Sequence, residues 1–167
     1  MFFLSIPYGV VLSPLLFLNE YTYKLLIIKD EIMNKEETIK LSVNQLIEEG
    51  EFDVVEKVFS SNYIAHAGNK EYKGHDFIKK FAKQLRSTIP DVKVINIEFL
   101  NNSGDIITWQ RTLSGTHQKN MMGIPASEKK IKWTDMIVSR FEGDNISEEW
   151  VVSELMGELL LKVPAKK

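Results

Sequence analysis

The sequence contains no cysteine and shows almost no imbalance of charge. Without thiols, the chain has no disulfides, no thiolate nucleophiles and no cysteine-based metal sites. Its 21 lysine and arginine residues nearly balance 23 acidic residues, and they form no long basic run. Nothing in the charge pattern therefore predicts nucleic-acid binding. A reducing compartment is compatible with such a chain, and we expect a cytoplasmic protein.

Most catalytic sequence signatures are also missing. The chain has no glycine loop that could cradle a phosphate, no G-x-S-x-G nucleophile motif, and no kinase or dinucleotide-binding signature. Its three histidines show none of the spacings that are typical of metal sites. We therefore expect neither a metal nor a cofactor.

The chain also lacks a long uninterrupted apolar run. Its first 18 residues are apolar, but Pro7, Gly9 and Pro14 interrupt them, so no stable membrane span is expected. The segment lacks the basic N-terminal region and the small-residue cleavage site that are typical of a secretory signal. Residues 1–32 are open to three interpretations: a weak export signal, a membrane-surface anchor, or a leader upstream of a true start at Met33. We favour the third, with export or membrane association as the alternative.

From residue 33 onward, helical periodicity comes first and strand alternation follows. The spacing of apolar residues predicts helices over residues 36–49 and 52–59 and a third helix that begins at residue 74 and is ended by Pro90, with a short extended piece at 62–68. After Pro90 the pattern alternates, as in strands. The strands are expected over residues 92–100, 106–116, 131–141 and 146–155, the last of which could continue to 163. This order indicates a single α+β domain over residues 33–163, with an antiparallel sheet.

Two of these strands carry residues suited to chemistry. In the last strand, alternation places Glu154 on the same face as Trp150. If that face is the inner one, Glu154 is desolvated and suited to general acid/base catalysis; taken alone, however, the pattern favours a solvated position at the rim of the sheet. In the second strand, Trp109, Arg111 and His117 share a face. These residues could line a pocket. Alternatively, Arg111 faces solvent and the aromatic ring of Trp109 covers it.

The remaining candidates have weaker signals. His66 precedes a glycine turn and could point into a cavity, although a lone histidine is more often structural. Met122 could form a pocket lip or simply pack. In the third strand, the face that carries Trp133 could point inward or outward.

Several short motifs together resemble the SnoaL-like polyketide cyclase (ester cyclase) family over about residues 36–161. They are Gly115-Thr116-His117, then residues 122–125 (MGIP), then Trp150 followed by an acidic residue four positions later. The resemblance implies a cone-shaped α+β barrel, in which N-terminal helices pack on a strongly curved antiparallel sheet around an apolar pocket. Ketosteroid isomerases and scytalone dehydratases share this architecture. Members are often homodimers, and the characterised cyclases close a ring by an aldol reaction without a cofactor or a metal.

Carried onto this chain, the resemblance gives the acid/base role to Glu154. It makes His117 a catalytic candidate, either as an orienting hydrogen-bond donor or as a structural lock, rather than the catalytic base. The candidate substrate-binding residues are His66, Trp109, Arg111, Met122, Trp133 and Trp150. The chain departs from the family in having Glu154 in place of the usual Asp, and Lys119 and Glu128 in place of usual glycines, where a positive φ would be strained.

We therefore expect cofactor-free acid/base chemistry on a mostly apolar, carbonyl-containing small molecule. This could be aldol cyclisation, isomerisation or dehydration. Two alternatives remain: a binding protein that uses the same pocket without catalysis, and an assembly unit whose pocket is filled by its own side chains.

Overall fold

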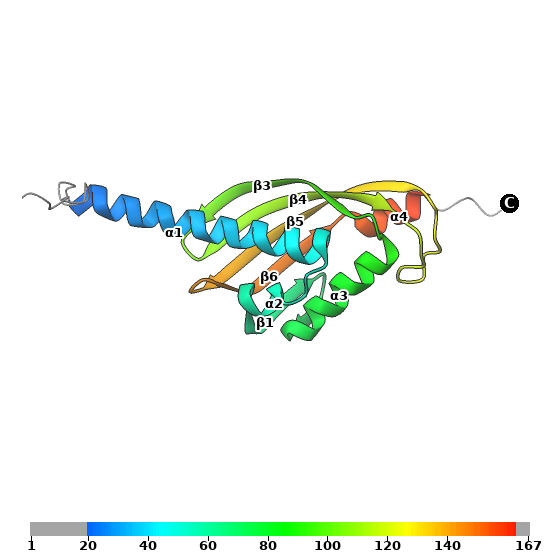
Figure 1. Ribbon diagram of the computed structural model, residues 1–167, viewed down its shortest axis with the longest axis horizontal. Coiled ribbons are helices and arrows are strands. Elements are labelled where there is room, and N and C mark those ends of the chain that lie inside the picture. The colour runs from blue at the N-terminus through cyan, green and yellow to red at the C-terminus, as the bar shows by residue number, and fades with distance from the viewer. Residues whose placement is uncertain (1–19, 163–167) are drawn as a thin grey trace, which may run out of the picture. The chain divides into compact units, whose positions relative to one another are not determined.

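A computed structural model describes residues 20–162 (Figure 1). The chain forms two compact units, residues 1–31 and 32–167, and helix α1 (Glu20–Ser42) runs from the first unit into the second. The predictions for residues 1–19 lie outside the described residues. No helix among residues 20–162 is long and apolar enough to cross a membrane.

Two short helical segments follow α1. The chain continues directly into a π-helix, η2 (Val43–Glu49), which ends at Gly50 with a φ of 81°. The guanidinium of Arg86 donates to the carbonyl oxygens of Ile47 and Glu48, which caps this helix end. The predicted helix over residues 36–49 is thus confirmed, although it begins earlier. Helix α2 (Val54–Val58) is shorter than predicted, because Phe59 already begins a strand.

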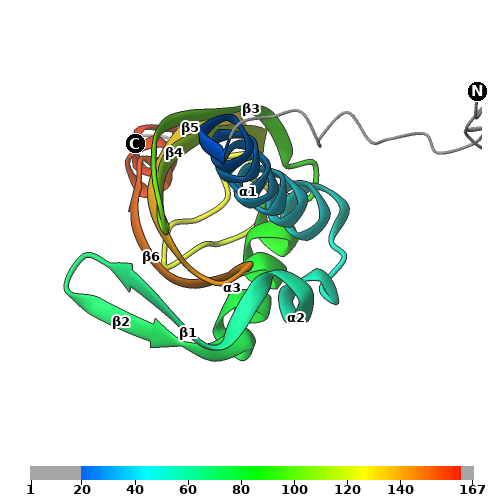
Figure 2. The same ribbon diagram turned by 90° about the vertical axis from the view of Figure 1, so that its left-hand side faces the viewer.

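Six strands form one curved sheet in the order β2-β1-β6-β5-β4-β3. Their bounds are β1 (Phe59–Ala67), β2 (Lys70–Lys73), β3 (Lys93–Ser103), β4 (Ile106–Thr116), β5 (Lys130–Glu142) and β6 (Asn145–Ser153). Strand β1 pairs in parallel with β6, and all other pairs are antiparallel. The sheet curls round but stays open, as Figure 2 shows. The α+β class is confirmed, with a mixed sheet rather than a wholly antiparallel one.

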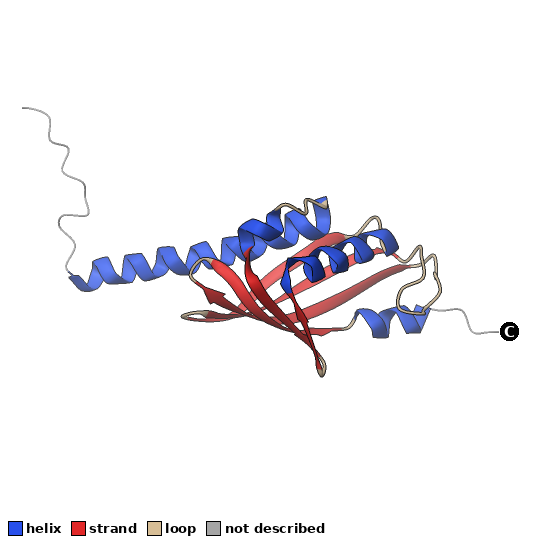
Figure 3. Cartoon of the chain, turned by 90° about the horizontal axis from the view of Figure 1, so that it is seen from below, coloured by secondary structure: helices blue, strands red, loops and turns tan. Residues whose placement is uncertain are grey.

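Helix α3 (Gly74–Thr88) packs against the concave side of this sheet (Figure 3). It is strongly amphipathic: Ile78, Ala82 and Leu85 are buried, and lysines occupy the solvent face. The helix ends before Pro90, as predicted. The last predicted strand does not continue to residue 163, because residues after Ser153 turn into helix α4 (Leu155–Lys162).

A bulge in β6 decides which of its side chains face inward. Arg140 of β5 pairs with Glu148, whereas Phe141 pairs with Ile146, so Ser147 has no partner on β5. The extra residue shifts the alternation by one position. Ile146 is buried on the inner face, and the next inner residues are Glu149 and Val151.

Candidate active site

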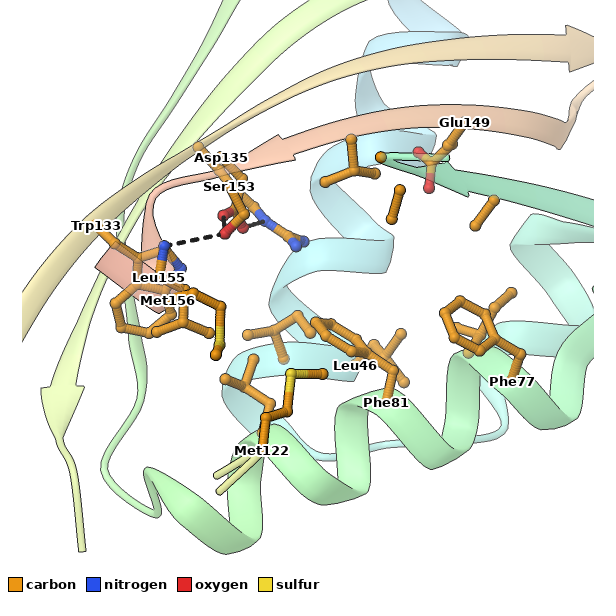
Figure 4. Close-up of a pocket in the computed structure, with 18 of the residues that line it drawn as sticks. Leu46, Phe77, Phe81, Met122, Trp133, Asp135, Glu149, Ser153, Leu155 and Met156 are labelled. Atoms are coloured by element: carbon orange, nitrogen blue, oxygen red, sulfur yellow. Dashed lines mark hydrogen bonds and ion pairs between the residues drawn. The ribbon is translucent and has the colours of Figure 1, made fainter. Parts of the chain in front are cut away.

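A cavity of about 370 Å³ lies between the concave face of the sheet and the helices that cover it (Figure 4). Helices η2 and α3 supply apolar walls, including Leu46, Phe77 and Phe81. Trp133 of β5 and Leu155 and Met156 of α4 extend this wall. Among the lining residues, the polar side chains are Tyr63, Arg111, Asp135, Glu149 and Ser153.

Three of these polar residues form a row across the sheet. Arg111 on β4 lies directly opposite Asp135 on β5, which lies opposite Ser153 on β6. The Nε of Arg111 donates to Asp135 Oδ2 at 2.9 Å, and Ser153 Oγ donates to Oδ1. Both members of the ion pair are largely buried. Within the described part of the chain, the terminal guanidinium nitrogens of Arg111 have no hydrogen-bond acceptor, so they are available to a ligand.

A second polar group surrounds Glu149. Tyr63 Oη donates to Glu149 Oε2 at 2.8 Å, and Ser139 Oγ donates to Oε1 at 2.6 Å. Behind them, Trp109 Nε1 donates to Ser139 Oγ at 2.8 Å. All four residues are buried, although Glu149 and Tyr63 also line the cavity.

Burial changes the protonation of both groups that line the cavity here. It raises the pKa of Glu149, and this rise is only partly offset by the hydrogen bonds from Ser139 and Tyr63 and by the charge of Arg111. Burial, and then the neighbouring Glu149 carboxylate, hold the pKa of Tyr63 well above its usual value. Glu149 therefore holds its proton more tightly than a carboxyl group in water does. This suits a group that exchanges protons with a substrate near neutral pH.

The two polar groups are separated by an apolar row. Trp109, Ile137 and Val151 are cross-strand neighbours between them. On β4, Arg111 belongs to the first group, and Ile107 lies opposite Ser139 of the second group. Arg111 and Ile107 are four residues apart. Four residues of strand span about 13 Å. This distance separates the backbone positions; the long side chain of Arg111 spans part of it, because its charge acts on Glu149.

Arg111, Met122 and Trp133, three of the predicted substrate-binding residues, line this cavity. Trp133 is buried in the wall, whereas Met122 is 64% exposed and lies at the mouth. Trp109 shares the inner face of β4 with Arg111, as expected, but it lies behind the wall and does not line the cavity. Its indole contacts Ser139 instead.

Glu154, the predicted acid/base residue, is exposed and does not line the cavity. Its carboxylate accepts a hydrogen bond from the backbone N–H of Thr134 at 3.1 Å. Of the two placements left open for Glu154, the solvated one is found; the inward placement together with Trp150 is wrong, because the bulge at Ser147 reverses the alternation of β6.

Trp150 and His66 also lie outside the cavity, on the outer face of the sheet. Their rings stack at 5.0 Å with an interplanar angle of 9°. His66 Nε2 lies 2.7 Å from Glu148 Oε1, and Arg140 pairs with the other oxygen of the same carboxylate. These contacts join β1, β6 and β5 on that face. The expected turn of His66 toward the cavity is therefore wrong: its neighbours Ala65 and Ala67 line the cavity, so the alternation of β1 turns His66 away.

His117 belongs to a structural corner at the end of β4. A Cβ on Gly115 would lie 2.3 Å from Ile89 Cγ2, so only glycine permits this close approach. Thr116 then donates from its N and Oγ1 to Asp91 at 2.6 and 2.9 Å. His117 is fully buried and does not line the cavity. Its Nδ1 lies 3.4 Å from Ser127 Oγ. The corner thus joins the sheet to the end of α3.

The loop after this corner contains two residues in the left-handed region, Met122 with a φ of 50° and Glu128 with a φ of 55°. Glu128 therefore has the conformation that a glycine would adopt without strain. Lys119 does not have a positive φ, so its side chain needs no local adjustment.

Sequence reasoning did not identify Tyr63, Ser139, Glu149 or Ser153 as site residues, and it left the face of Asp135 open. For Asp135 and Ser139 a signal existed, because Trp133 and Ile137 share their face and are apolar. Glu149 was hidden by the bulge. Among residues 20–162, no group of three or more histidine or acidic side chains could hold a metal ion.

Comparison with known proteins places this geometry in a family. Residues 37–160 match the family model described as SnoaL-like polyketide cyclase. A candidate SnoaL-like polyketide cyclase from Jannaschia sp. CCS1 superimposes with a TM-score of 0.69 at 18% identity, covering 82% of this chain and 96% of that one. AclR from Streptomyces galilaeus, a candidate hydroxylase, gives 0.68 at 19% identity, covering 80% and 99%. These likenesses show the fold. A search of curated proteins found no match to the sequence.

Proposed function

Because this chain belongs to the SnoaL-like polyketide cyclase family, we propose that it performs cyclase- or isomerase-type acid/base chemistry on a neutral carbonyl compound in the cavity. One observation carries the proposal: Glu149 is a buried carboxyl group that borders an apolar cavity and has a raised pKa. The acid/base role, which the family resemblance assigned to Glu154, is thereby transferred to Glu149.

The character of the cavity favours a neutral, mostly apolar substrate. Its volume of about 370 Å³ lies within the range of small-molecule sites. Arg111 already pairs with Asp135, so the polar groups that line the cavity carry no excess of positive charge. With Glu149 ionised, the cavity is net negative and disfavours an anionic ligand. A polyketide-like ketone or ester satisfies these conditions.

The proposed step is proton abstraction next to a carbonyl. The Glu149 carboxylate removes a proton from the α-carbon, the C–H electron pair moves into a carbon–carbon double bond, and the carbonyl oxygen becomes an enolate oxygen. In one outcome, the enolate carbon attacks a second carbonyl carbon of the same molecule: a carbon–carbon bond forms, the C–O π bond of that carbonyl breaks, and its oxygen takes the proton back from Glu149. In the other outcome, a neighbouring double bond extends the enolate, and a different carbon takes the proton back from Glu149. The first outcome is cyclisation, and the second is isomerisation.

Arg111 is suited to stabilise the enolate. Its Nε is occupied by Asp135, which fixes the direction of the planar guanidinium, and its terminal N–H groups are available to the developing oxygen charge. It contacts the face of Trp109 as well, with the guanidinium carbon 5.9 Å from the ring centre. A fixed donor in an apolar cavity stabilises such a charge more than a mobile one in water.

A second candidate function is supported by one observation. Both oxygens of Glu149 and both oxygens of Asp135 already accept hydrogen bonds from the protein. Fully satisfied carboxylates are also what a binding protein would need to hold a neutral ligand without reacting with it. The same cavity would then carry or sense an apolar metabolite. The relatives named as cyclases and as a hydroxylase show that the fold alone does not choose between such roles.

Deuterium exchange distinguishes the two candidates. The full chain, freed of metal with EDTA, is incubated in D2O with a panel of neutral ketones and esters, and binding is scored by native mass spectrometry. Exchange of the α-protons of bound compounds supports the enzyme. The variant E149Q is expected to lose exchange while still binding, and E154Q, whose carboxylate lies outside the cavity, is expected to keep it. Bound compounds that exchange no protons with the wild-type protein would favour the binding function.

The predicted homodimer remains part of this proposal. A solution mass measured by light scattering at twice the chain mass would support it, and a mass equal to that of one chain of 19.2 kDa would contradict it.

A further inference from the structure

The hydrogen bonds behind Glu149 have a fixed direction. An indole N–H can only donate, so Ser139 Oγ must be the acceptor of the bond from Trp109 Nε1. The single hydroxyl hydrogen of Ser139 is then directed to Glu149 Oε1, 2.6 Å away. Ser139 has no exposed surface, and Trp109 is buried, so water does not compete for either bond.

The two oxygens of Glu149 are consequently not equivalent. Oε1 faces a donor whose direction cannot be reversed without leaving the buried hydroxyl hydrogen of Ser139 without an acceptor among the described residues. Oε2 faces the hydroxyl of Tyr63, which can donate to a carboxylate or accept from a carboxylic acid. A proton taken up by Glu149 is therefore accommodated at Oε2 and not at Oε1.

We propose that Trp109 and Ser139 are positioning residues that keep Glu149 Oε1 as a permanent acceptor and so confine the exchanged proton to Oε2, beside Tyr63. The inference rests on the proposed acid/base role of Glu149. When Oε2 receives the substrate proton, Glu149 donates to the oxygen of Tyr63, and the hydroxyl hydrogen of Tyr63 is free to turn into the cavity. Proton abstraction and hydrogen bonding to the enolate are thereby coupled.

Other charges near Glu149 do not obscure this effect. Of the described groups besides Ser139, Tyr63 on β1 lowers the pKa of Glu149 through its hydrogen bond and Arg111 on β4 lowers it through its charge. Asp135 on β5 is paired with Arg111. Helices η2 and α3 contribute only apolar side chains to the cavity. Removing the Ser139 hydroxyl therefore changes mainly one stabilising contact of the ionised form.

The test measures the titration of Glu149 by ¹³C NMR of labelled carboxyl groups in the full chain, assigned by the signal that E149Q lacks. Ser139→Ala removes a donor from the ionised form, so the midpoint is expected to rise by about one pH unit. Trp109→Phe keeps an aromatic side chain but removes the indole N–H that holds Ser139, so a smaller rise is expected. In the S139A background, W109F is expected to add no further rise, because Trp109 acts through Ser139.

Two further variants serve as controls. Ser139→Thr keeps the hydroxyl and is expected to restore the midpoint to near the wild-type value. Ser114→Ala removes another buried serine hydroxyl, one that donates to the carbonyl of Ile131, and is expected to leave the midpoint of Glu149 unchanged. An unchanged or lowered midpoint in S139A would overturn the proposal, as would an equal effect of W109F with and without Ser139. Should S139A not fold, an unchanged midpoint in W109F alone would overturn it.

The readout is independent of substrate. If α-proton exchange fails but these midpoints shift as expected, the proposed reaction is wrong and the positioning chain stands. If exchange succeeds and the midpoints do not move, the reaction stands and the positioning chain is wrong.

Discussion

Replacing Asp135 by Asn tests how strongly the buried ion pair of the cavity holds the fold. The change preserves the size of the side chain but removes the negative charge that lies 2.9 Å from Arg111 Nε. Breaking a buried pair by removing one partner costs about 3–5 kcal/mol, because the remaining charge is left uncompensated. Arg111 borders the cavity and its side chain is 13% exposed, so we expect the lower end of this range, about 3 kcal/mol. For a domain of this size, that lowers the Tm by about 10 °C.

Urea unfolding followed by circular dichroism measures the effect, provided that the slope of the transition is unchanged. The double variant R111M/D135N is expected to be more stable than D135N, since it also removes the unpaired cation. Glu56→Gln is the matched control, because it removes the carboxylate of the exposed Glu56–Lys79 pair and should leave the midpoint almost unchanged. If D135N were no less stable than E56Q, or if the double variant were less stable than D135N, the reasoning would be refuted.

Three further predictions concern the corner and loop beside the cavity. Gly115→Ala is expected to destabilise the protein by about 1–3 kcal/mol in urea unfolding, because the new methyl group would overlap Ile89; a neutral effect would contradict the close approach. Glu128→Gly is expected to raise stability by up to about 1 kcal/mol, since it removes a left-handed strain, and a loss of stability would contradict that conformation. The backbone N–H of Thr116 lowers the pKa of Asp91 in the folded protein, so this contact stabilises above about pH 4 and is lost as the pH falls through the lowered pKa. The difference in urea midpoint between wild type and Asp91→Ala should therefore shrink on acidification, and a constant difference from pH 6 to pH 2 would count against it.

Local patterns predicted those elements whose period is long and regular. Helix α3 and strands β4 and β5 begin and end close to the predicted residues, because ten or more positions repeat one period and turn residues bound them. The parallel pairing of β1 with β6 joins segments about 85 residues apart. No local pattern carries that information. Helix α4 was taken as a possible continuation of a strand, since a short apolar run fits either period.

The difference between regular local patterns and long-range pairing also explains which site residues could be predicted. Arg111 was identified because its strand alternates without interruption, whereas Trp133 was named as a candidate with the inner face of its strand left open. Glu149 was missed, and Glu154 was placed inside, because a single extra residue at Ser147 reverses every side chain that follows it. A bulge of this kind depends on the pairing of β5 with β6, which the residues of β6 alone do not determine. The family resemblance identified the fold correctly but could not correct this register.

The most direct test of the account is a crystal structure of the protein with the tightest-binding ketone from the exchange panel. We expect the ligand to lie in the cavity, with its carbonyl oxygen within hydrogen-bond distance of a terminal nitrogen of Arg111 and its α-carbon facing Glu149 Oε2. A ligand that binds instead on the outer face, beside Arg140 and Glu148, or that lies in the cavity with its carbonyl group turned away from both Arg111 and Glu149, would contradict the central claim.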